Sequence, residues 1–246
     1  MIHARFPAIL EAAMTMYRRL DAHKIVATAR LLQSRIGERF PLSGLSKLGD
    51  EVSKVAEETL DRLTWIQKPH IPLRLGVFLL VVVILFVLGL LFATLRVSDL
   101  HEMATFIQVL EAGLSCIFFI GASVIFLLTW ESRIKRNRAL ASIHELRAMA
   151  HIVDMHQLTK DPGAGGTSWA QTASSPRRSL NPFELGRYLD YCSEMLSIIG
   201  KIAALYSQSL EDPVVLDAVD DVEDLTTELS QKIWQKIALL DKSGGV

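Results

Sequence analysis

Residues 75–95 read LGVFLLVVVILFVLGLLFATL, an apolar run of 21 positions without a charged residue. At a rise of about 1.5 Å per residue, a helix of this length measures roughly 31 Å, the thickness of the hydrocarbon core of a bilayer. A helix at the surface of a water-soluble core shows a polar face, and this stretch has none. The run therefore predicts a transmembrane helix.

A second apolar run follows at residues 107–130, IQVLEAGLSCIFFIGASVIFLLTW, and it is also long enough to span a bilayer. Its one ionisable residue is Glu111, and the connection 96–106 between the runs has 11 residues. This is enough for a turn but too little for a domain. The two runs predict a two-span transmembrane hairpin, and the position of the first run excludes a cleavable signal peptide.

Basic residues flank this hairpin unequally. Three lie shortly before the first run and four shortly after the second, whereas the connection has only Arg96. Because cytoplasmic flanks carry the excess of Lys and Arg, we expect a multi-pass protein of the plasma (inner) membrane with both termini in the cytoplasm. The flanking residues are Arg62, Lys68, Arg74, Arg133, Lys135, Arg136 and Arg138.

The remaining sequence predicts an all-α fold, because apolar residues recur at helical spacing and no strand pattern is present. We expect two helices over about 8–36 and 43–66, and a hinge at Lys68-Pro69-His70-Ile71-Pro72. No Gly or Pro occurs from Ala122 to Asp161, so the second span is expected to continue into the cytoplasm as one long helix.

The C-terminal part predicts an antiparallel helix hairpin. Asn181, Pro182 and Glu184 form a helix-start signal, and Asp212-Pro213 repeats the pattern after a short link. Packing of the coiled-coil type is expected for such amphipathic helices. The predicted domains are an N-terminal cytoplasmic helical pair (1–68), the transmembrane hairpin (69–130), the extension of the second span (131–161), a flexible linker (162–181) and the C-terminal helix hairpin (182–241).

A histidine-rich stretch in the extension is the candidate metal or catalytic site. At 100° per residue, His144, His151 and Asp154 share one face, and the Asp154 carboxylate is placed to orient His151 or to share a metal with it. The HExxH motif is absent, and so is any Cys/His spacing of a metal site. A polar network between helices is the alternative interpretation, and we expect neither a catalytic residue nor a cofactor.

Two further sets of residues are candidate contacts. Small and polar side chains in the spans favour helix association or a pore, while an acidic face near the C-terminus favours a solvated surface or docking of a basic partner. The pore or helix-contact candidates are Gly89, Ala93, Glu111, Ser115, Cys116 and Ser123, and the docking candidates are Asp217, Asp221, Asp224 and Glu228.

Charge is distributed unevenly along the chain. Residues 1–74 carry 12 Lys and Arg against 8 Asp and Glu, whereas residues 183–246 carry 5 against 12. The acidic C-terminal part argues against nucleic acid as a partner, and topology accounts for the basic flanks.

Three functional hypotheses remain open at this point. The first is a non-enzymatic membrane-anchored scaffold, or a signalling or assembly protein, that contacts a second copy or a protein partner through its cytoplasmic helices. The second is an oligomeric channel or pore-forming effector lined by the second span. The third is a membrane-bound metalloenzyme.

Overall fold

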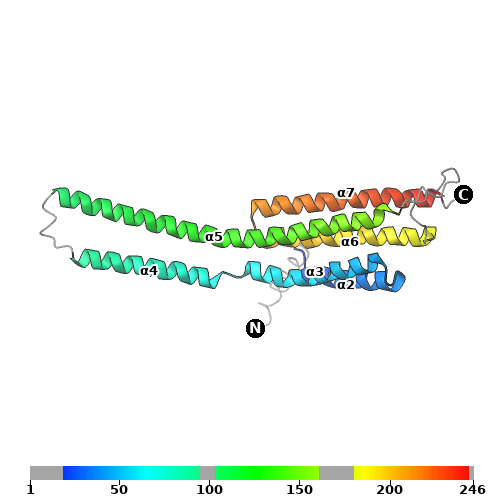
Figure 1. The fold of residues 1–246 in the computed structure, drawn as a ribbon, viewed down its shortest axis with the longest axis horizontal. Coiled ribbons are helices and arrows are strands. Elements are labelled where there is room, and N and C mark those ends of the chain that lie inside the picture. The colour runs from blue at the N-terminus through cyan, green and yellow to red at the C-terminus, as the bar shows by residue number, and fades with distance from the viewer. Residues whose placement is uncertain (1–18, 95–102, 161–179, 244–246) are drawn as a thin grey trace, which may run out of the picture. The chain divides into compact units, whose positions relative to one another are not determined.

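The computed structural model describes residues 19–94, 103–160 and 180–243, and every regular element within these ranges is an α-helix. The predicted all-α class is therefore confirmed. The helices in Figure 1 are α2 (Ala22–Arg39), α3 (Gly44–Gln67), α4 (Ile71–Thr94), α5 (Met103–Leu158), α6 (Pro182–Ser209) and α7 (Pro213–Ser243).

Three helix starts show how the local sequence sets the boundaries. The Asn181 side chain accepts a hydrogen bond from the Glu184 N–H, and the Glu184 carboxylate accepts one from the Asn181 N–H, so the predicted capping box is confirmed. The Asp212 carboxylate caps α7 by accepting from the N–H groups of Val214 and Val215. The Asp21 carboxylate caps α2 in the same way.

The N-terminal helix differs from its expected boundaries. The expected start near residue 8 lies outside the described residues, and the described helix α2 begins only at Ala22 because Asp21 caps it. Helix α2 continues past the expected end at residue 36 to Arg39. The break comes before Pro41, which disfavours helix in the residue that precedes it.

Contacts between residues divide the chain into two units. The described residues within 1–67 and 138–246 form one unit, here called the helical body, and those within 68–137 form the other, here called the hairpin. Helix α5 contributes its first part to the hairpin and its last part to the helical body.

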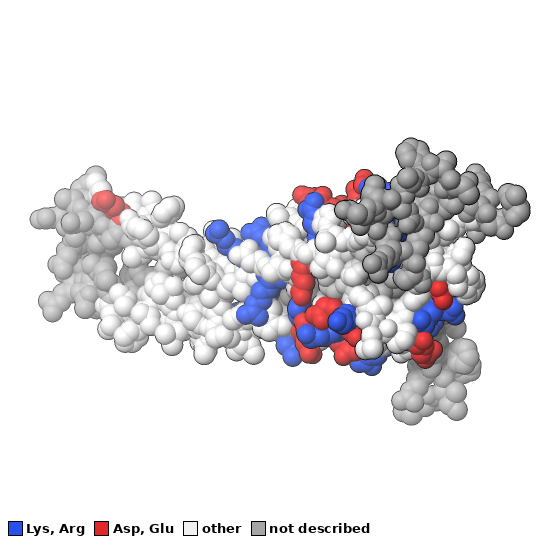
Figure 2. Space-filling view, turned by 45° about the vertical axis from the view of Figure 1, so that its right-hand side comes forward, with Lys and Arg blue, Asp and Glu red and all other residues white. Residues whose placement is uncertain are grey.

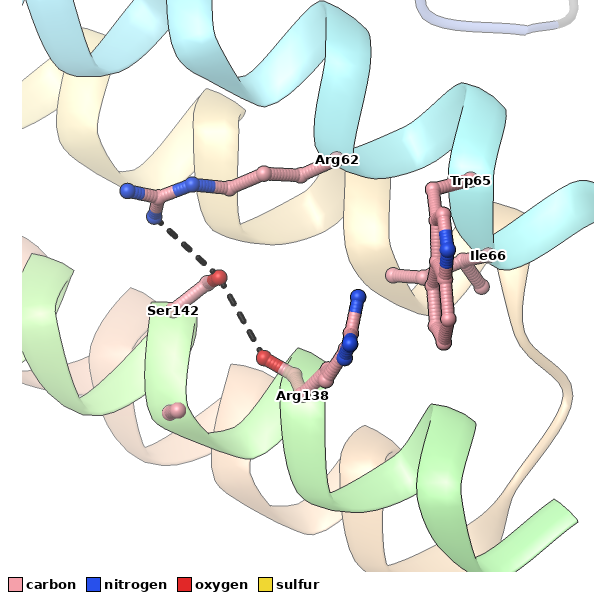
Figure 3. A pocket seen from close by; sticks show the side chains of 6 residues that line it. Arg62, Trp65, Ile66, Arg138 and Ser142 are labelled. Atoms are coloured by element: carbon pink, nitrogen blue, oxygen red, sulfur yellow. Dashed lines mark hydrogen bonds between the residues drawn. The ribbon is translucent and has the colours of Figure 1, made fainter. Parts of the chain in front are cut away.

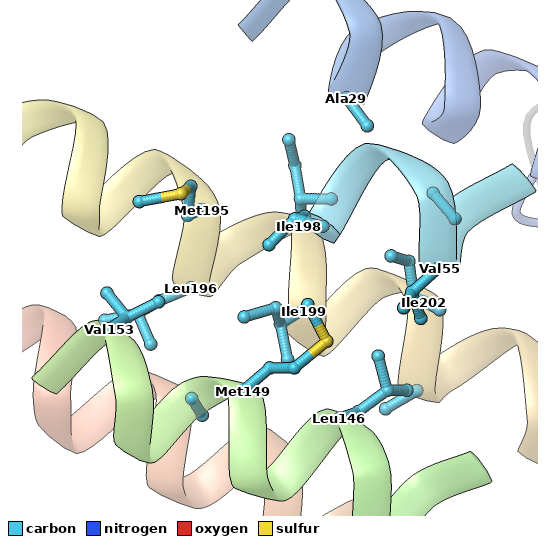
Figure 4. Close-up of a cluster of buried hydrophobic side chains, with 14 of the residues drawn as sticks. Ala29, Val55, Leu146, Met149, Val153, Met195, Leu196, Ile198, Ile199 and Ile202 are labelled. Atoms are coloured by element: carbon cyan, nitrogen blue, oxygen red, sulfur yellow. The ribbon is translucent and has the colours of Figure 1, made fainter. Parts of the chain in front are cut away.

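Helix α6 lies at the centre of the helical body. It packs against α7 along most of its length and also contacts α2 and α3. Figure 4 shows Leu146, Met149 and Val153 of α5 pointing toward Leu196 and Ile199 of α6. These five side chains are at most 5% exposed, so the last part of α5 joins the same core.

The close approach of α6 and α7 depends on Gly200. A Cβ atom at this position would lie 3.1 Å from the Thr226 Oγ1 of α7, which is tighter than ordinary van der Waals contact. A larger residue would push the two helices apart or force Thr226 to move.

The hairpin contains the apolar runs and has the opposite exposure pattern. Phe78, Leu79 and Phe86 of α4 are each more than 60% exposed, as are Phe118 and Phe119 of α5. The structure has two helices that are long and apolar enough to cross a membrane, judged by length and composition. The predicted absence of a helix break after Ala122 is confirmed to Leu158, where α5 ends.

Candidate functional site

A polar cluster joins the two helices of the hairpin around Glu131 of α5. The Glu131 carboxylate accepts hydrogen bonds from the His70 N–H at 3.2 Å, from Arg74 Nε at 3.2 Å and from Lys135 Nζ at 3.0 Å. The residue is 7% exposed although it directly follows the exposed Trp130. One carboxylate thus links the start of α4 to α5.

Glu131 is ionised throughout the physiological pH range. Burial raises the pKa of its carboxyl, but the hydrogen bonds from Lys135, the His70 N–H and Arg74 outweigh this effect and bring the pKa down to about 2. A neutral side chain at this position would leave two cations without their shared counter-charge.

Sequence reasoning missed this cluster. The spacing of four residues between Glu131 and Lys135 was a visible signal for an ion pair on a helix. The partners from the other helix, His70 and Arg74, precede Glu131 by about 60 positions, and no sequence pattern links them to it. Only the packing of α4 and α5 in the folded chain brings them together.

The helical body holds a pocket between α3 and α5, shown in Figure 3. Its volume is about 210 Å³, and its lining residues are Arg62, Trp65, Ile66, Arg138, Ala141 and Ser142. The Arg138 guanidinium stacks on the Trp65 indole with 3.8 Å between Cζ and the ring centroid. This stacking presents a charged group at a largely apolar pocket.

The other arginine of the pocket is already paired. Arg62 donates to Glu58 at 2.7 Å, to Glu145 at 2.6 Å and to the Ser142 hydroxyl at 3.2 Å, and Ser142 in turn donates to the Arg138 carbonyl. Ligand pockets usually measure about 300–1,000 Å³, so this pocket suits a single side chain or a small group better than a cofactor.

The histidine stretch does not form the predicted arrangement around His151. His144 and His151 are exposed, and the Asp154 carboxylate accepts from Gln157 Nε2 at 2.5 Å. Gln157 also accepts from Lys236 of α7, both at its carbonyl and at its side chain. Across the described ranges, no three His, Cys, Asp or Glu residues are grouped as metal ligands. Of the three candidate residues, Asp154 alone joins this set of polar contacts between α5 and α7.

The candidate residues of the spans occupy two different surfaces. Cys116 and Ser123 are partly covered, whereas Glu111 and Ser115 are exposed. Gly89 is also exposed, and a Cβ built on it meets nothing within 4 Å. The side chain of Ala93 lies outside the described residues. The structure thus separates the polar candidates Glu111 and Ser115 from Cys116 and Ser123.

The acidic candidates of α7 are all exposed: Asp217, Asp221, Asp224 and Glu228. Asp221 forms an ion pair with Arg147 of α5 at 3.3 Å, in which both side chains are at least half exposed. At such exposure an ion pair contributes little to stability. Part of this acidic face therefore meets a basic residue of the same chain.

Cys192 of α6 is fully buried in the core of the helical body. Burial raises the pKa of its thiol to about 12, against the smaller lowering influence of Lys236 and Lys160. Such a thiol is uncharged at neutral pH and a poor nucleophile.

Comparison with known proteins gives no relative for this chain: no family model matches the sequence, no curated protein is significantly similar to it, and no solved structure significantly resembles it.

Proposed function

We propose that this chain is a membrane-anchored helical scaffold, which acts through protein contacts of its helical body. Helix α4 and the first part of α5 would form the anchor in the inner membrane, with both termini in the cytoplasm. Support for the anchor comes from the large apolar side chains that the hairpin exposes, which water would solvate poorly. Support for the orientation comes from the unequal distribution of Lys and Arg around the apolar runs.

The observation that carries the scaffold function is an exposed apolar surface on the last turns of α5. Ile152 is 43% exposed, Met155 is 66% exposed and Leu158 is 61% exposed. The opposite face of the same turns is buried, as Met149 and Val153 show. Methionine and other large apolar side chains are typical of adaptable protein contacts. These exposed residues would contact a second copy of the chain or another protein.

Crosslinking in membranes tests the scaffold function. A photoreactive amino acid at Met155 is expected to give a discrete adduct, and the substitution Ile152→Asp is expected to abolish it. Lys232, which is exposed on α7, provides the matched position where no adduct is expected. A chain that remains monomeric and without adducts from position 155 would contradict the proposal.

Cysteine accessibility tests the anchor and its orientation. In a variant that lacks Cys116 and Cys192, a cysteine at Leu100 is expected to react with an impermeant reagent from outside the cell, whereas one at Lys232 is not. Labelling of both positions only after the membrane is opened would refute the orientation.

A channel is the second candidate function, and the exposure of Glu111 favours it. Within the predicted second span Glu111 is the one ionisable residue, and it lies near Ser115 on an exposed face. A carboxylate in the apolar phase costs several kcal/mol unless water or a polar partner surrounds it. Ion flux through reconstituted protein that Glu111→Gln reduces would support a channel, and vesicles that stay tight would contradict it.

A further inference from the structure

All the described cations of the hairpin lie at one end of it. They are Lys68, Arg74, Arg133, Lys135 and Arg136, here called the basic rim. The apolar stretches beyond the basic rim contain one Asp, Glu, Lys or Arg among the described positions, Glu111. Figure 2 shows Lys and Arg side chains gathering where a long stretch of surface with almost no charged residue ends.

The only carboxylate among residues 68–74 and 131–137 does not neutralise this charge. Glu131 is buried and binds Arg74 and Lys135, so its single negative charge is shared inside the cluster. Lys68, Arg74, Arg133 and Lys135 alone outnumber this anion by three charges. Lys68 and Arg133 are exposed and form no ion pair with any described residue.

Aromatic side chains adjoin the basic rim on the apolar side. Trp130 is 48% exposed and packs against Phe126, with 5.4 Å between the ring centroids. Tryptophan is enriched at the level of lipid headgroups because its ring is apolar and its N–H is polar. Exposed cations beside such a ring would lie at the depth of the lipid headgroups, whose phosphate groups carry the opposite charge.

We propose that the basic rim binds anionic phospholipids, with Lys68 and Arg133 as the principal contacts. This inference rests on the proposed membrane anchor and adds a lipid preference to it. Anionic headgroups supply the counter-charge that Glu131 does not provide, and an exposed Lys or Arg near a charged leaflet strengthens association about five-fold. Zwitterionic lipids carry no net charge and gain no such attraction.

The test measures the affinity of the detergent-solubilised full chain for fluorescent phosphatidylglycerol and for phosphatidylcholine. We expect stronger binding of phosphatidylglycerol, a loss of about five-fold for Lys68→Gln or Arg133→Gln, and a loss of roughly 25-fold for the double variant. Raising the salt concentration is expected to remove most of the preference. Lys232→Gln, an exposed cation of the helical body, is the matched control and is expected to bind like the unchanged protein.

Three results would overturn this inference: equal affinity for the two lipids, unchanged binding by the double variant, or displacement of phosphatidylglycerol by inorganic phosphate at similar concentrations. Helical content measured by circular dichroism verifies that each variant is folded. Carbonate extraction of membranes tests separately whether the chain is anchored in the membrane. A chain that resists extraction but binds both lipids equally refutes the lipid preference alone, whereas a chain that is extracted refutes the anchor.

Discussion

Leu196 in the helical body and Leu79 in the hairpin are the same side chain on the same kind of helix, yet their exposure differs completely. Leu196 is 0% exposed and Leu79 is 64% exposed. The helical body covers its apolar residues with its own helices, while the hairpin leaves them uncovered. The comparison shows that an apolar segment can form a helix without being buried by the rest of the chain. Helix formation and burial both occur in the helical body, whereas the helices of the hairpin form and leave their apolar side chains uncovered.

The largest expected effect comes from truncating the two leucines. Leu196→Ala is expected to lower the free energy of unfolding of the helical body by about 2–5 kcal/mol, because it leaves a cavity among α5, α6 and α7. Leu79→Ala removes no contact of that core and is expected to change the value by less than about 0.5 kcal/mol. Denaturant unfolding of the full chain in detergent measures both. Equal losses would contradict the difference in burial between the two leucines.

Glu131→Gln tests whether the hairpin has its own polar stabilisation. The variant keeps the size of the side chain but removes the charge that Arg74 and Lys135 share, and it is expected to lose about 1–3 kcal/mol. Thermal unfolding in detergent measures the loss. Ser132→Ala, at the exposed neighbouring position, is the control and is expected to have no effect.

The effect of Glu131→Gln on stability is also expected to depend on pH. The pKa of Glu131 is lowered from 4.5 to about 2, so its contribution to stability is complete above pH 4.5 and disappears as the pH falls toward 2. The stability difference between the unchanged protein and Glu131→Gln is therefore expected to shrink over this range. A difference that stays constant with pH would contradict the assigned charge.

The smallest expected effect comes from replacing one glycine in each of the two units by alanine. Gly200→Ala places a Cβ 3.1 Å from Thr226 Oγ1 and is expected to cost about 1 kcal/mol. Gly76→Ala of α4 meets nothing within 4 Å and is expected to leave the unfolding midpoint of the helical body unchanged. Calorimetry of both variants makes the comparison. An unchanged midpoint for Gly200→Ala would mean that α7 moves away at little cost.

The sequence allowed prediction of those features that depend on neighbouring residues. The apolar run 75–95 corresponds to α4 because no residue in it interrupts a helix, and the capping box at Asn181 corresponds to the start of α6. Contacts between distant segments were not predictable. The Glu131 cluster and the pocket of Trp65 and Arg138 each join residues more than 50 positions apart.

The candidate sites illustrate the same limit. The face shared by His151 and Asp154 followed from helical geometry, but the preference of Asp154 for Gln157 depends on how Lys236 of α7 packs against that helix. The expectation of one continuous helix over about 8–36 overlooked Asp21, whose side chain caps a new helix that begins at Ala22. The outcome of competition between such contacts can be predicted only when the three-dimensional neighbours of each residue are known.

Burial of Cys192 has a practical consequence. A thiol that is both enclosed and protonated reacts with alkylating reagents only when α6 separates from its neighbours. The rate of alkylation at this position therefore reports how often the helical body opens, and no residue has to be replaced to measure it. In living cells, the same measurement would reveal whether binding of a partner holds those helices shut.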